Sequence, residues 1–303
     1  MMGNRGIAQL LVLWALILLG TLAAGFSLSM RTEAQAARNA LDDARAYYQA
    51  RTGISRAVML LSTLPPDNVA RMAIEGEDGD ASYRVRIASE SGKVDINSVS
   101  EEDLLGILKK GGLPDEEAEG VRDAILDWKD ADDDPRPRGA EFPDYARLPE
   151  PLRPRNGNLR GVGELRYVKG VAPEYYDGFL SRVFTAHGNF PQVNANYAPE
   201  IVLSSLPGVS KEAVAEILEK RAADPPVLPA DLAEMAGRGL LTPKGLSLVS
   251  GGRVSRVYEI IAKGRAGPAV FHTIRCLVEV SGTGGDRVRI IGWLDLAQRE
   301  GEA

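Results

Sequence analysis

The sequence has few of the side chains on which enzymes and soft-metal centres usually depend. Its single cysteine, Cys276, excludes an intramolecular disulfide and a thiolate metal cage, because each needs at least a second sulfur. Only two histidines occur, His187 and His272, and neither lies beside a serine or cysteine that it could activate. No nucleophile, base and orienting group form a credible pattern, so we do not expect an enzyme.

Positive charge is outnumbered by negative charge. The 303 residues include 36 Lys and Arg against 42 Asp and Glu, a formal net charge of −6. This balance provides no general attraction to nucleic acid or to an anionic membrane surface, so a polyanion would need a local basic patch. The hydrophobic share of 44% is ordinary for a folded protein of this length, which has room for roughly two domains.

Formal charge is absent from Ile7 to Phe26. As a helix this run spans about 30 Å, the thickness of the hydrocarbon core of a bilayer. Arg5 precedes it and favours a cytoplasmic N-terminus, so the rest of the chain would face outward. A cleavable secretory signal is the alternative, because the small residues 23–25 could supply a peptidase site.

Proline is absent from Phe26 to Leu64, and Gly53 is the one glycine inside the later part of this stretch. We therefore expect one continuous helix over residues 7–64, about 85 Å long, which Pro65 and the next proline end. Apolar residues recur on it at steps of three or four: Ala34, Ala37, Leu41, Ala44, Tyr48, Ile54, Val58 and Leu61. One globular domain cannot cover such a length, so the stripe needs neighbours from other subunits.

The segment from Gly6 to Trp14, together with Ala46 to Ile54, resembles the N-terminus of type IV pilin-like proteins. The resemblance implies that residues 1–6 are a leader cut after Gly6 by a prepilin peptidase, which leaves an N-methylated Ile7. Leu11 stands at the fifth mature position, where major pilins carry a glutamate. That departure is typical of the protein K family of minor pseudopilins.

Strand patterns flank a long helical region. Ser82 to Ala88 alternates polar and apolar residues, as a half-buried strand packed on the long helix would. Three more strand-like runs, separated by turn segments at 264–268 and 282–286, predict an antiparallel meander: Ser255 to Ala262, Ala269 to Val280 and Arg287 to Leu296. We predict an α+β, pilin-like domain from residues 65–93 and 253–303, interrupted by an all-α insertion over 94–252.

A weak internal repeat divides the insertion into halves of about 94–190 and 191–252. Val94-Asp-Ile-Asn97 followed by Leu113-Pro114 is echoed by Val193-Asn-Ala-Asn196 followed by Leu206-Pro207. The second copy resembles a helix-hairpin-helix motif, whose turn amides often hold a nucleic-acid phosphate. A membrane-tethered, competence-like DNA receptor is therefore the alternative function. The 16 acidic and six basic residues between Asp95 and Asp144 oppose it and favour packing or protein docking.

Hard oxygen ligands are concentrated between Asp127 and Glu141. A solvated acidic loop is one interpretation. Calcium is the other, because it accepts six to eight flexible oxygen ligands, although the spacing does not fit an EF-hand. The stretch resembles the one that binds calcium in the protein K family. We expect a structural Ca²⁺ held first by Asp130, Asp132 and Glu141, and further by Asp127 and Asp134.

With the N-terminus and the insertion, the resemblance to the protein K family of type II secretion systems covers nearly the whole chain. It implies a single-pass protein of the bacterial inner membrane with its C-terminal domain in the periplasm, at the tip of a pseudopilus. Such a subunit helps to start pseudopilus assembly and the export of folded proteins. The implied partners are minor pseudopilins I and J, then H and the major pseudopilin G, with the prepilin peptidase and no nucleic acid.

Overall fold

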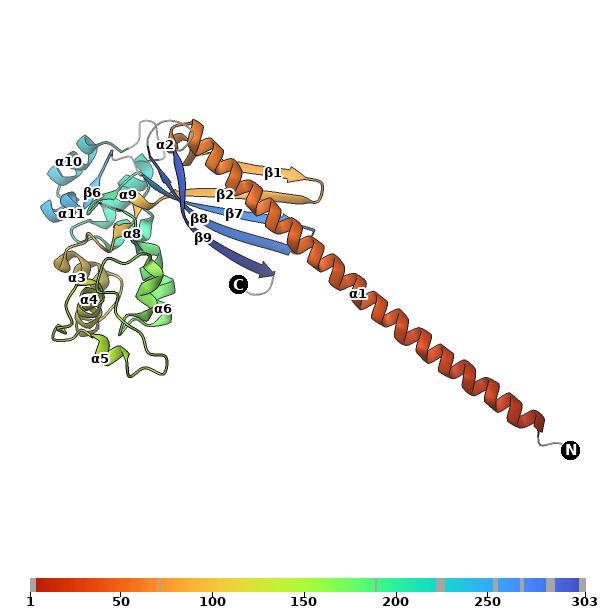
Figure 1. Ribbon diagram of the computed structural model, residues 1–303. Helices are drawn as coiled ribbons and strands as arrows, with labels where there is room; N and C mark the ends of the chain where they lie inside the picture. Colours follow the sequence, from red (N-terminus) through yellow and green to blue (C-terminus); the bar gives the residue numbers. More distant parts are fainter. Residues whose placement is uncertain are drawn as a thin grey trace.

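The computed structural model describes residues 4–70, 72–188, 190–221, 227–252, 256–267, 270–281 and 287–299. A single long helix, α1 (Asn4–Thr63), runs from the N-terminus into a head made of a sheet and a group of short helices (Figure 1). The predicted long helix is confirmed, with its start at Asn4 and its end just before Pro65. A short helix, α2 (Pro66–Ala70), follows it. Residues 1–3 of the predicted leader lie outside the described part.

α1 has two sections with different surroundings. Residues 9–41 are exposed throughout, and the part of the helix that begins at Gln9 is long and apolar enough to cross a membrane, with a mean hydropathy of 2.2 in its most apolar window. The C-terminal section instead packs on the sheet, through residues spaced three or four apart: Ala46, Ala50, Ile54, Ala57 and Leu61. The expected apolar stripe is therefore not one continuous line. The side of α1 that faces the sheet is rotated away from Tyr48, which stays 61% exposed.

The predicted antiparallel sheet is also confirmed, with five strands in the order β1-β2-β7-β8-β9. Their bounds are β1 (Ile74–Asp78), β2 (Ala81–Ser89), β7 (Val257–Ala266), β8 (Val270–Val280) and β9 (Val288–Arg299). Strand β1 was not expected, since its sequence is acidic and contains Gly76. A Cβ at Gly76 would lie 2.6 Å from the ring of Tyr83, so the glycine allows the two strands to pair with that ring between them.

The turn predicted at residues 264–268 is shorter than expected in its described part, because β7 continues to Ala266. Gly264 lies inside β7, not in a turn, because a close approach requires it: a Cβ there would be 2.0 Å from the backbone oxygen of Ala46 on α1. The remaining predicted ends and turns at 253–255, 268–269, 282–286 and 300–303 lie outside the described residues.

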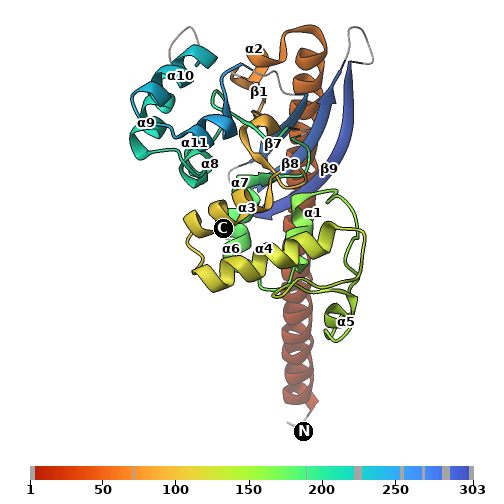
Figure 2. The same ribbon diagram turned by 90° about the vertical axis from the view of Figure 1, so that its left-hand side faces the viewer.

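The chain between β2 and β7 forms two helical units (Figure 2). The first contains η1 (Glu90–Gly92), β3 (Val94–Asp95), α3 (Glu101–Lys110), α4 (Asp115–Lys129), α5 (Phe142–Tyr145), η2 (Val162–Tyr167), α6 (Pro173–Tyr175), η3 (Tyr176–Leu180), α7 (Ser181–Val183) and β4 (Phe184–Thr185). The second contains β5 (Val193–Asn194), α8 (Glu200–Ser205), α9 (Lys211–Lys220), α10 (Pro229–Gly237), α11 (Pro243–Leu248) and β6 (Val249–Ser250).

Each helical unit is closed by a short parallel strand pair, which an all-α insertion would not contain. β3 pairs with β4, and β5 pairs with β6. The extended residues that open each unit have buried backbone groups, and these need a partner from the end of the same unit. The apolar core is likewise divided: one buried cluster joins the two helical units, and another joins α1 to the sheet.

Candidate functional site

The acidic loop predicted as a cation site begins where α4 ends. Three acidic residues in the first turn of α4 and Lys129 in its last turn both suit the helix dipole. Pro135 and Pro137 prevent the helix from continuing through the acidic run, which is not helical from residue 130 to residue 141. The loop then turns back along α4 and leads into α5 directly after Glu141.

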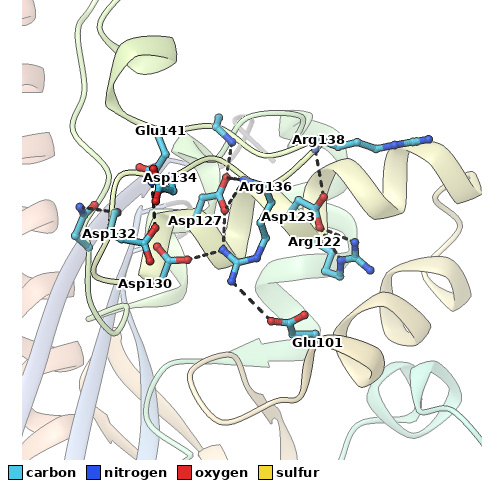
Figure 3. A network of polar contacts seen from close by, with 12 residues as sticks. Glu101, Arg122, Asp123, Asp127, Asp130, Asp132, Asp134, Arg136, Arg138 and Glu141 are labelled. Carbon is cyan, nitrogen blue, oxygen red and sulfur yellow. Dashed lines mark hydrogen bonds and ion pairs between the residues drawn. The ribbon is translucent and has the colours of Figure 1, made fainter.

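Two buried carboxylates one turn apart on α4 hold this loop. Asp127 is fully buried, and its Oδ2 accepts hydrogen bonds from the backbone N–H groups of Ala140, at 2.9 Å, and Arg136, at 3.1 Å. Its Oδ1 accepts from the Arg136 guanidinium at 2.7 Å. Asp123, which the sequence did not single out, accepts from the backbone of Arg138 at 3.3 Å. Asp127 therefore shapes the loop with oxygens that are already hydrogen-bonded (Figure 3).

Three of the predicted ligands come together on the other side of the loop. Asp130, Asp132 and Glu141 each offer a carboxylate oxygen, and these oxygens lie within 4.8 Å of one another. Glu141 is only 1% exposed, and neither of its side-chain oxygens has a hydrogen-bond partner within the described residues. The same holds for Oδ1 of Asp130, whose Oδ2 is paired with Arg136. Buried carboxylate oxygens without donors are costly, so this group needs a cation or a proton.

The electrostatic environment of Glu141 also shows that this group lacks positive charge. Burial, and then the carboxylates of Asp127 and Asp130, raise its pKa from 4.5 to about 7. The guanidinium of Arg136 bonds to Asp127 and Asp130 and not to Glu141. Three hard oxygen donors with excess negative charge suit a divalent cation of the calcium type better than one that prefers nitrogen or sulfur.

The other predicted ligand and a missed residue lie at the rim. Asp134 is exposed and is not one of the three clustered residues; its backbone N–H donates to Oδ1 of Asp132 at 3.1 Å. Asn156, at a φ of 47°, donates its amide to Oδ1 of Asp133 at 3.0 Å, and its backbone N–H to Trp128 on α4 at 3.1 Å. The only sequence signal for it was the Asn-Gly pair typical of a tight turn.

The predicted processing site lies at the start of α1. Gly6 and Ile7 are in the first turns of this helix, which begins at Asn4. Cleavage after Gly6 would therefore remove its first turn and leave the apolar segment intact.

Several known proteins are similar to parts of this chain. A family model described as type II secretion system (T2SS), protein K matches residues 84–186, which include most of β2 and the first helical unit with its acidic loop. The type II secretion system protein K of Pectobacterium carotovorum is 35% identical over 94 residues, which is 31% of this chain and 29% of that protein. The predicted resemblance to the protein K family is confirmed over this part of the chain.

Other protein K sequences align over longer stretches at lower identity. The Pseudomonas aeruginosa protein is 25% identical over 57% of this chain and 60% of its own length. A putative protein K of Escherichia coli K12 is 25% identical over 65% of this chain and 67% of its own length. The chain thus spans between about a third and two thirds of the length of these relatives.

The fold is shared with a solved structure. A chain of the GspK-GspI-GspJ complex from enterotoxigenic Escherichia coli matches with a TM-score of 0.61 and 15% identity, over 88% of this chain and all of that one. Most of the chain therefore has a known fold, and these relatives do not favour a DNA receptor.

Proposed function

We propose that this protein is a minor pseudopilin of a type II secretion system, a non-enzymatic subunit of the pseudopilus tip. In this proposal α1 is a single-pass anchor in the bacterial inner membrane, and the head lies in the periplasm. There it helps to start pseudopilus assembly and so the export of folded proteins.

The observation that carries the proposal is the exposure of α1. Residues 9–41 are exposed throughout, although many are large and apolar. A bilayer can cover the first 20 residues or so, but the stretch beyond it needs the helices of other subunits. The solved complex named above contains GspI and GspJ, which supports pseudopilins I and J as the first of these neighbours. In this proposal H and the major pseudopilin G lie further along the filament.

Cleavage and methylation of the N-terminus provide the sharpest test of whether the protein is a pseudopilin. Mass spectrometry of the mature protein from the bacterial membrane should find a chain that begins with methylated Ile7, produced by a prepilin peptidase. A Gly6→Ala variant should remain uncleaved, and an otherwise matched Gly20→Ala variant should be processed normally. A mature chain that starts near Gly25 would instead identify an ordinary secreted protein.

Association can be tested separately on the exposed section of α1. Ala37→Glu places a charge on the apolar stripe, and Asn39→Glu places the same charge on the opposite, polar side. We expect the first variant, and not the second, to lose co-purification with pseudopilins I and J from detergent and to abolish secretion in a complementation assay. Equal behaviour of the two variants would contradict packing through this stripe.

We also propose that the acidic loop holds a structural Ca²⁺. Asp130, Asp132 and Glu141 are its ligands, while Asp127 keeps the loop in shape and Asp134 lies at the rim. When bound, the ion supplies the positive charge that Glu141 lacks. The residues do no hydrolysis in this proposal, and the two helical units serve as packing or docking modules.

Calorimetric titration of the full-length protein in detergent tests the metal site. We expect one saturable calcium site, lost in Glu141→Gln and Asp130→Asn but retained in Glu116→Gln, which changes an exposed acidic residue on α4. Chelator should lower the melting temperature of the wild type and leave that of Glu141→Gln unchanged. Absence of heat, together with a melting temperature that chelator does not alter, would reject the site.

A further inference from the structure

The face of the sheet that points away from α1 carries a line of basic residues. Arg84 and Arg86 alternate along β2 with residues that are buried under α1, and Lys263 and Arg265 do the same along β7. All four are exposed. The long helix lies along one face of the sheet (Figure 1). Because side chains two apart on a strand share a face, and the residues between these four are buried on the α1 side, the four project together on the other face.

These cations are only partly neutralised by the chain itself. Arg84 pairs with Glu75 on β1 at 3.5 Å. Within the described residues, Arg86, Lys263 and Arg265 have no carboxylate within 4.0 Å. Lys263 lies directly opposite Arg84 in the β2–β7 register, and like charges that face each other across strands are destabilising. The face therefore has an excess of positive charge that an anion could relieve.

The basic residues line a groove together with acidic and apolar side chains. The groove has a volume of about 550 Å³ and is lined by the four cations, by Ile261 and Phe271, and by Glu75 and Glu77 at its β1 edge. Nζ of Lys263 lies 4.2 Å from the centre of the Phe271 ring, and the guanidinium carbon of Arg265 lies 5.9 Å from it. The face of the aromatic ring attracts both cations.

We propose that this basic groove binds an extended, acidic segment of a partner protein, with carboxylates on alternate residues. Alternate side chains of any extended chain repeat about every 6.8 Å, which is also the spacing of Arg84 from Arg86 and of Lys263 from Arg265. A segment lying along β2 and β7 would therefore place successive acidic residues beside Arg265, then beside the opposed Arg84 and Lys263, and then beside Arg86. The intervening side chains would point away from the sheet, toward solvent or the rest of the partner.

The same geometry argues against a phosphate or lipid headgroup as the ligand. Phosphate sites usually present several converging backbone N–H groups, as at a helix N-terminus. Here β2 and β7 are paired with neighbours on both edges, so their backbone groups are used within the sheet. The groove offers only side chains at strand spacing, which suits the carboxylates of a peptide.

Fluorescence anisotropy with a labelled peptide of four Glu-Thr repeats tests the proposal on the full-length protein in neutral detergent. We expect saturable binding that weakens as salt is raised. Arg86→Glu combined with Lys263→Glu should weaken binding at least about tenfold, a loss that corresponds to about 1.4 kcal/mol. Lys211→Glu, which reverses an exposed charge on α9, should leave the affinity unchanged. The assay is independent of secretion, so its result does not depend on the proposed function.

Three controls make the outcome decisive. A Gln-Thr repeat should not bind, and a peptide with the same four Glu in one block should bind more weakly than the alternating one. Equal binding of the alternating and block peptides, or binding that survives the double substitution, would overturn the proposal. So would preferential binding to vesicles of anionic phospholipid that the groove substitutions abolish, since the ligand would then be a lipid surface.

Discussion

Asn97 and Asn196 close the two helical units with the same pair of hydrogen bonds. Oδ1 of Asn97 accepts from the backbone N–H of Leu159 at 2.9 Å, while its Nδ2 donates to the carbonyl of the same residue at 3.0 Å. Asn196 makes the equivalent pair with Val227, at 2.9 Å in both directions. In each unit an asparagine near the start thus fixes a backbone segment much further along the chain.

Substitution of either asparagine should open one unit and not the other. Asn97→Ala removes both bonds to Leu159 and a third, at 3.4 Å, to the carbonyl of Ala186. Because partly buried backbone groups then lack partners, we expect a loss of about 3 kcal/mol in the free energy of unfolding of that unit. Hydrogen exchange should accelerate in residues 94–186 for Asn97→Ala and in residues 193–250 for Asn196→Ala. Asn39→Ala on exposed α1 is the control, and acceleration of both units by either variant would contradict separate closure.

The sequence showed that these asparagines are related but not what they bind. The repeat placed Asn97 and Asn196 three residues after Val94 and Val193, and the structure gives them the same role. Their partners lie 62 and 31 residues further along the chain. Neither periodicity nor spacing reports contacts at that separation, so the closing bonds became visible only in the fold.

Elements with a clear periodic pattern in the sequence were predictable, whereas features that depend on contacts between distant residues were not. The long helix followed from the absence of proline, and the sheet followed from alternation. The acidic loop was recognisable from its density of carboxylates, but the division of labour within it was not. Asp127 and Asp130 look alike in sequence. Because the loop returns toward α4, Asp127 accepts hydrogen bonds from the loop backbone, whereas Asp130 keeps one side-chain oxygen without a hydrogen-bond partner in the described residues.

Gly139 should be essential for the shape of the acidic loop. A Cβ at this position would lie 1.8 Å from Oδ2 of Asp127, the atom that accepts from the backbone of Ala140. We expect Gly139→Ala to force the loop off α4 and to lower the free energy of unfolding by about 2–4 kcal/mol, through a lost buried hydrogen bond and steric strain. Chemical denaturation measures the loss. Gly157→Ala is the matched control, since the nearest atom to its added Cβ is 3.9 Å away; equal stability of the two variants would contradict this account.

The raised pKa of Glu141 predicts a specific pH dependence in the presence of chelator. The native state keeps a proton between pH 4.5 and about 7 that the unfolded chain releases, so this group destabilises the fold increasingly as pH rises through that window. Glu141→Gln removes the charge. The variant should have the same free energy of unfolding as the wild type below pH 4.5, and should be the more stable of the two by at most about 3 kcal/mol above pH 7.

Thermal unfolding from pH 4 to pH 8 in chelator, with and without added calcium, checks this prediction. Calcium should reverse the order at pH 8, because it can stabilise the wild-type carboxylate and not the amide of the variant. A difference between the two proteins that stays constant with pH would show that Glu141 is ionised normally. Asp134→Asn, an exposed change in the same loop, controls for a general effect of removing negative charge.

The hairpin turn at Leu206–Ser210 packs against the first helical unit. Gly208 adopts a φ of 77° there, and a Cβ on Gly106 of α3 would lie 2.7 Å from the ring of Pro207. The carbonyl groups of Leu206 and Val209 accept hydrogen bonds from Nζ of Lys110, at 2.7 and 3.2 Å. This turn therefore joins the two units, and α3 covers the side on which Pro207 lies.

Lys110 should consequently stabilise the junction between the units through its charge and not only through packing. Lys110→Met keeps most of the apolar stem but removes both charge-assisted bonds, so we expect a loss of about 1.5–3 kcal/mol in the free energy of unfolding. Lys109→Met removes the neighbouring lysine, whose ion pair with exposed Asp115 should contribute less than about 1 kcal/mol. Chemical denaturation measures both losses, and hydrogen exchange should accelerate at the turn only in the Lys110 variant. Equal, small losses would mean that the turn holds its conformation without α3, and that the two units are joined by their shared apolar core alone.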